Sequence, residues 1–150
     1  MLKAIAQINL EISQIDDLLA SYDHLFARTN QNEFNLVEIT ALASVLHSFY
    51  NGIENIFLCI AKRIDHDVPH NDRWHRDLLL SMGKPTKTRP AVLSMTILAK
   101  LTDYMAFRHY YRHSYSYTLE WGELRTLVTP LKPLWQDTRK ELLLFLSKIS

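Results

Sequence analysis

The residues between Phe107 and Tyr117 combine side chains that are suited to chemistry on phosphates. These eleven residues include two arginines, two histidines and four tyrosines. Histidine can exchange a proton near neutral pH, and the planar guanidinium of arginine can bind a phosphate through two hydrogen bonds. Tyrosine rings can stack on unpaired bases. The combination favours RNA cleavage without a metal, by attack of a ribose 2′-hydroxyl on the adjacent phosphate. The alternative is an amphipathic helix end with half-buried tyrosines and solvated charges.

Arg108 and His113 are the catalytic candidates of this segment. We expect His113 to transfer a proton and Arg108 to bind the scissile phosphate. On a regular helix these two side chains point about 140° apart, whereas Arg108, Arg112 and Tyr115 lie within about 60° of one another. Tyr115 lies only about 20° from Arg108. We therefore expect the helix to end or distort near His113, or two chains to share one cleft.

Two further groups carry metal-ligand side chains. His109 and His113 are four residues apart, which places two imidazoles on one helical face. A polar connector holds the second group: Asp65, His66, Asp67 and His70. Neither group offers a complete ligand set, and no metal or other cofactor is expected. The lone cysteine, Cys59, lies in an apolar run and is expected to be a buried structural thiol.

Apolar residues at helical spacing predict the elements that position these side chains. The predicted helices cover residues 5–26, 33–65, 73–82, 90–112 and 130–149. Thr129 and Pro130 are expected to be the N-cap and the first residue of the last helix. The stretch 113–128 shows no clear pattern. Three glycines in 150 residues also favour helices. The sequence thus predicts an all-α antiparallel bundle of four or five helices, in one domain over residues 1–150.

Two residues inside the second predicted helix call for an explanation. Gly52 costs up to about 1 kcal/mol relative to alanine there, which indicates a close helix contact or a site that needs room. Glu54 is a candidate buried acid, one turn from Tyr50 and Asn51. It could form structural hydrogen bonds or support the active-site arginine, and the sequence does not distinguish between these two roles.

The net charge of +1 hides an uneven distribution. Acidic residues dominate residues 1–60, and basic residues dominate residues 84–113. Such asymmetry can create a surface that attracts phosphates, although two complementary faces packed in one bundle would give the same pattern. No stretch has the signature of a signal peptide or the roughly 20 apolar residues of a membrane span. We therefore expect a soluble, cytoplasmic protein.

The pattern Arg108-(x4)-His113-x-Tyr115 resembles the Arg-x4-His-x-Tyr motif of the HepT toxins, a branch of the HEPN superfamily. The residues around it, Phe107 to His109 and Leu119-x-Trp121, resemble the same branch, as does the stretch 49–56 in the second predicted helix. The resemblance covers nearly the whole chain. It implies a HEPN bundle of four or five helices that forms a homodimer and places two motif copies in one cleft.

The resemblance also implies a function. It implies the toxin of a type VII-like toxin–antitoxin pair, a metal-independent endoribonuclease that acts through Arg108 and His113 and leaves 2′,3′-cyclic phosphate ends. RNA is the expected substrate, with tRNA among the candidates. The expected partner is a minimal nucleotidyltransferase antitoxin, which would neutralise the toxin by AMPylation of Tyr115. Four residues are expected to support the site: Asn51, Glu54, His109 and Arg112. The alternative is a non-catalytic helical HEPN module that only binds a nucleotidyltransferase.

Overall fold

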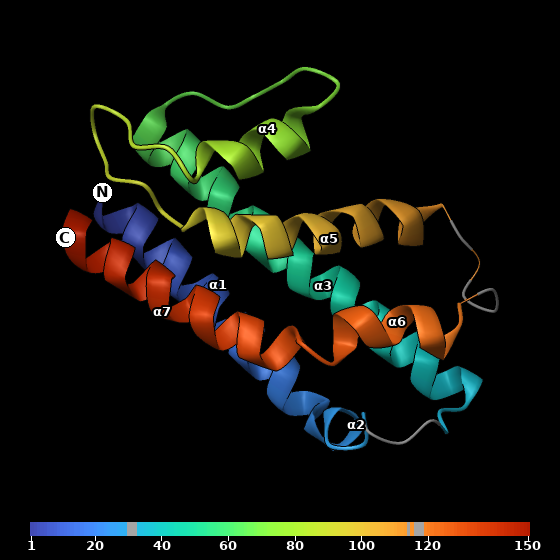
Figure 1. The fold of residues 1–150 in the computed structure, drawn as a ribbon. Helices are drawn as coiled ribbons and strands as arrows, with labels where there is room; N and C mark the ends of the chain where they lie inside the picture. Colours follow the sequence, from blue (N-terminus) through green and yellow to red (C-terminus); the bar gives the residue numbers. More distant parts are fainter. Residues whose placement is uncertain (30–32, 114, 116–118) are drawn as a thin grey trace.

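Four long helices form most of the computed structural model, which describes residues 1–29, 33–113, 115 and 119–150 (Figure 1). They are α1 (Leu2–Ser21), α3 (Leu36–Ile60), α5 (Met95–Arg112) and α7 (Leu131–Ile149). Shorter helices lie between them: α2 (Asp23–Phe26), α4 (Trp74–Ser81) and α6 (Trp121–Val128). A π-helical turn, η1 (Ala61–Asp65), extends α3. The described ranges contain no strand, so the predicted all-α helical bundle is confirmed.

The central element is α3, which packs against α1, α4, α5 and α6. Its predicted apolar stripe is entirely buried: Leu42, Leu46, Phe49, Ile53, Ile56 and Ile60. In Figure 1, α1 and α7 lie side by side on one side of the bundle, and α4 lies on the opposite side, against α3 and α5. No helix built from the described residues is both long and apolar enough to cross a membrane.

Several helix boundaries differ from the predicted ones, and side-chain caps explain the starts of α3 and α5. The first predicted helix is interrupted at Tyr22, where φ is −110° and ψ is 16°. The second begins at Leu36 rather than near residue 33, because Asn35 and Glu38 form a capping box. The fourth begins at Met95 rather than at Pro90, since the Ser94 side chain accepts a hydrogen bond from the Ile97 N–H at 3.3 Å.

The prediction for the last helix is wrong by one residue. Pro130 occupies the N-cap position of α7, and Thr129 is the C-cap of α6. This α6 lies in the stretch for which the apolar spacing was unclear, and its eight residues bury only Leu124 and Val128. A helix this short offers too few apolar positions to show a period of its own.

Gly52 lies at a close contact between α1 and α3. A Cβ atom on Gly52 would lie 2.8 Å from Cγ1 of Ile15, a side chain that is itself buried. The close helix contact therefore explains this glycine. Cys59 is buried at the same interface, with Sγ 3.7 Å from the carbonyl oxygen of Ala4, and burial raises the pKa of its thiol. The predicted burial of this cysteine is confirmed.

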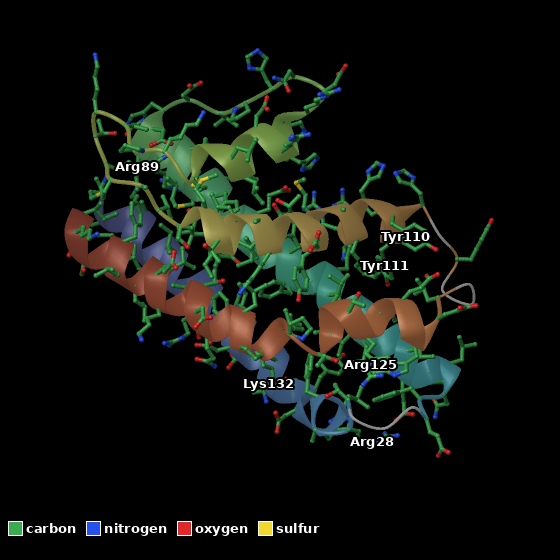
Figure 2. The ribbon with its side chains drawn as sticks, in the orientation of Figure 1. Arg28, Arg89, Tyr110, Tyr111, Arg125 and Lys132 are labelled. Carbon is green, nitrogen blue, oxygen red and sulfur yellow. The ribbon has the colours of Figure 1, made fainter. Side chains whose placement is uncertain are left out.

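Arg89 ties the connection before α5 to the end of η1 (Figure 2). Its buried guanidinium donates to both carboxylate oxygens of Asp65, from Nε to Oδ1 at 2.7 Å and from Nη2 to Oδ2 at 2.9 Å. It also donates to the carbonyl oxygens of Lys84 and Pro90 at 3.0 and 3.1 Å. Asp65, a metal-ligand candidate in the sequence, is thus engaged by an arginine. Across the described residues, no three histidine, cysteine or acidic side chains gather where they could hold a metal.

We expect Arg89→Ala to lower the free energy of unfolding by about 3–5 kcal/mol, because it leaves a largely buried carboxylate without its partner. Urea denaturation of the purified protein measures this change. The matched control is Arg125→Ala on the exposed side of α6, which should change stability by less than about 0.5 kcal/mol. Equal stability of the two variants would contradict the structural role of the Arg89–Asp65 pair.

Candidate active site

Arg108 continues the buried stripe of α5. The preceding positions on that face are Ile97, Leu101 and Tyr104, and Arg108 follows at the same helical spacing with 5% of its surface exposed. A buried guanidinium needs a charged partner and satisfied donors. The neighbouring helix α3 supplies the charged partner and two acceptors, because Asn51 and Glu54 lie one turn apart on the face that meets α5.

The Arg108 guanidinium is held from three sides. Its Nη1 donates to Oε1 of Glu54 at 2.8 Å and to Oδ1 of Asn51 at 3.0 Å. Its Nη2 lies 2.9 Å from Nδ1 of His75, which in turn lies 2.8 Å from Oε2 of Glu54. The guanidinium carbon lies 5.4 Å from the centre of the Tyr50 ring, a favourable cation–π distance. Side chains from two neighbouring helices, α3 and α4, therefore fix the orientation of this arginine.

An open cleft of about 330 Å³ lies beside this network, between α4 and α5. Four arginines and two histidines line it: Arg73, Arg76, Arg108, Arg112, His75 and His109. Asp72 is the one acidic side chain in its described lining. Because Glu54 offsets the charge of Arg108, the positive potential of the cleft comes mainly from the other arginines. The arrangement suits a phosphate or another anion.

His113 lies directly after the last residue of α5, as its C-cap, with φ −111° and ψ 12°. The predicted helix end near His113 is therefore confirmed. The side chain is exposed, and its ring centre lies 4.8 Å from that of His109, which lines the cleft. In the described part of the chain, no hydrogen bond joins His113 to Arg108. The two catalytic candidates thus lie at neighbouring but separate places, one buried and one at the surface.

Tyr115 does not share a helical face with Arg108. That prediction assumed a regular helix through residue 115, and it is wrong because α5 ends at Arg112. The Tyr115 side chain is 74% exposed. Figure 2 shows the neighbouring tyrosines Tyr110 and Tyr111 at the carboxyl end of α5.

Two histidines near the site were not among the sequence candidates. His75 precedes the buried Leu78 and Leu79 by three and four residues, the spacing of a core-facing position, and this was the available signal. Its ring stacks on Trp74 with centres 3.5 Å apart. His47 lies one turn before Asn51 on α3, with Nδ1 3.4 Å from Nδ2 of Asn51.

The surroundings of His47 favour its neutral form. Burial lowers the pKa of its imidazole, and the positive charges of Arg112 and Arg108 lower the pKa further. Its ring centre lies 4.9 Å from that of Tyr111. His47 is therefore a neutral neighbour of the arginine network at neutral pH, and not an additional cation.

The all-helical fold of the described residues is that of a helical bundle of the HEPN type. A family model described as "HepT-like protein" matches residues 41–149. The chain belongs to this HepT-like family of the HEPN superfamily. The matched range includes every residue of the Arg108 network and the cleft beside it. No curated protein and no solved structure matches the chain significantly.

Proposed function

We propose that this chain is a metal-independent endoribonuclease and the toxin of a toxin–antitoxin pair. The observation that carries the proposal is the Arg108 guanidinium, fixed by Glu54 and Asn51 at the wall of a basic cleft. A phosphate that enters this cleft meets donors whose orientation is set in advance. Membership of the HepT-like family supports the toxin role. RNA is the proposed substrate, with tRNA among the candidates.

The proposed reaction needs little besides proton transfer and charge stabilisation. A ribose 2′-oxygen attacks the adjacent phosphorus, and His113 exchanges a proton with one of the reacting oxygens. Arg108 binds the phosphate as its negative charge increases, and Arg112 and His109 support binding from the same helix. The products are a 2′,3′-cyclic phosphate and a 5′-hydroxyl.

We expect the purified protein to cut single-stranded RNA in EDTA. His113→Ala should lower the rate about 10²–10⁴-fold, because it removes a proton-transfer group. Arg108→Ala should also be nearly inactive, and gel analysis with end mapping measures both. The matched control is His70→Ala, which removes an exposed histidine from the connector before α4. Activity lost on chelation and restored by a divalent ion would favour a metal at His109 and His113. Intact RNA in every condition would favour the non-catalytic module.

We also propose that two copies of the chain form a homodimer whose cleft is lined by residues 104–115 of both protomers. The separation of buried Arg108 from exposed His113 within one protomer supports a shared site, since the second copy could supply the missing group.

Mixing two inactive variants tests this assembly. Light scattering should give twice the 17.6 kDa of one chain. After subunit exchange, Arg108→Ala and His113→Ala should together recover about a quarter of wild-type activity, because half of the dimers are mixed and each has one intact composite site. An active monomer would contradict the dimer. A dimer without recovery would place Arg108 and His113 of one protomer in the same site.

We also propose that modification of Tyr115 inhibits this nuclease. The proposed partner is a minimal nucleotidyltransferase antitoxin that attaches adenylyl groups to the Tyr115 hydroxyl. The large exposure of this side chain supports access by an enzyme. Each adenylyl group adds a phosphodiester charge and a base that can stack, so the modification resembles RNA and could occupy the basic cleft.

We expect co-expression with such a nucleotidyltransferase to increase the mass of the protein by one or more adenylyl units and to abolish toxicity. Tyr115→Phe should lose the mass increase and remain toxic, because the acceptor hydroxyl is gone. Tyr110→Phe is the matched control and should still be modified and neutralised. Intact-mass spectrometry and growth assays measure both effects. A Tyr115→Phe variant that is still modified would assign the acceptor to another tyrosine, with Tyr111 or Tyr117 the next candidates.

A further inference from the structure

His75 connects the buried arginine network to the open cleft. Its Nδ1 lies 2.8 Å from Oε2 of Glu54 and 2.9 Å from Nη2 of Arg108, two side chains that are each only 6% exposed. The His75 side chain itself is 35% exposed and lines the cleft. Stacking on Trp74 holds the plane of the ring. Nδ1 faces the buried groups, and no hydrogen bond joins Nε2 to a described residue.

The position of the ring proton of His75 decides whether Nδ1 forms a hydrogen bond with Glu54 or with Arg108. A carboxylate only accepts hydrogen bonds, and a guanidinium only donates them. Nδ1 can therefore donate to Glu54 or accept from Arg108, but it cannot do both at once. When the proton is on Nδ1, the neutral ring keeps a lone pair on Nε2, and Nη2 of Arg108 is released from His75. The ring is then a base held by a carboxylate, beside an arginine with a free donor.

Metal-free RNA cleavage requires two proton transfers, one from the attacking 2′-hydroxyl and one to the leaving 5′-oxygen. His113 can perform one of them. We propose that His75 is the second proton-transfer residue and acts as the general base, an inference that rests on the proposed ribonuclease function. Nε2 takes the proton of the 2′-hydroxyl while the 2′-oxygen bonds to phosphorus. The bond from phosphorus to the 5′-oxygen breaks, and that oxygen takes a proton from the His113 imidazolium.

Phosphate binding and the base form of His75 support each other in this arrangement. A phosphate that draws Nη2 of Arg108 into the cleft leaves Nδ1 free to carry its proton and donate to Glu54. Glu54 then holds the ring in the reactive tautomer and stabilises the imidazolium that forms. The other charged or titratable groups around His75 come from α4, the residues before it and α5: Asp72, Arg73, Arg76, Arg108, His109 and Arg112.

The variant His75→Gln tests the proposal, because glutamine keeps a polar side chain that can hydrogen-bond to Glu54 or Arg108 but cannot transfer protons. We expect it to bind RNA carrying a 2′-deoxy sugar at the scissile position as the wild type does, and to cleave ordinary RNA about 10²–10⁴-fold more slowly. The decrease in cleavage rate at acidic pH that is expected of the wild type should be absent in His75→Gln. Added imidazole should partly restore the activity of His75→Ala, which a merely structural role would not allow. His70→Ala should behave like the wild type.

A substrate with a sulfur in place of the scissile 5′-oxygen assigns the two roles, because a thiolate leaves without a proton. His113→Ala should cleave this substrate at nearly the wild-type rate, whereas His75→Gln should remain slow. The reverse pattern would overturn the assignment of His75 as the base. If His75→Gln cleaves ordinary RNA at the wild-type rate and pH profile, His75 transfers no proton, and the ribonuclease function still stands. If the wild type cleaves no RNA, both proposals fail.

Discussion

The ion pair between Arg108 and Glu54 is the interaction on which the rest of the site depends. Each partner is almost completely buried, and each comes from a different helix of the core, α5 and α3. Desolvation of two charges is expensive, and removal of one would leave the other unpaired at a cost of several kcal/mol. The pair therefore constrains how α5 lies on α3, and through α5 it places His109 and Arg112 at the cleft, with His113 beside His109 at the helix end. Asn51 accepts a second hydrogen bond from Nη1, and His75 lies within hydrogen-bond distance of Nη2.

That ion pair determines how the positive charge of the cleft is divided among its arginines. Because Glu54 offsets its charge, Arg108 adds little net charge to the cleft. A polyanion is therefore attracted mainly by the exposed arginines, Arg73, Arg76 and Arg112. An anion in the cleft also competes with Glu54 for the arginine donors. The buried pair thus orients the Arg108 guanidinium, part of which can still bind an anion. The exposed arginines raise the local concentration of phosphates.

The sequence predicts the helical bundle, the buried stripe of α3 and the end of α5 near His113, because these follow from periodicity and from the geometry of a regular helix. It also indicates Glu54 as an unusual acid in an apolar helix. His75 could not be ranked in the same way, since its importance arises only when α4 packs against α3 and α5. The starts of α3 and α5 were misplaced because single side-chain caps, Asn35 and Ser94, determine them. Tyr115 was misplaced because a regular helix was extended past its real end.

The end of α5 at Arg112 has a consequence for the stability of the segment that carries the proposed site. The carboxyl end of a helix carries roughly half a negative charge from its unpaired carbonyl groups, and nearby cations stabilise it. His109 and Arg112 lie in that last turn. The Arg112 guanidinium, which the proposed function assigns to RNA binding, therefore also stabilises the helix end when no RNA is present. A neutral residue at position 112 would fray the last turn and, under the proposed function, would also weaken phosphate binding. Under the same proposal, bound RNA would draw this cation away from the helix end.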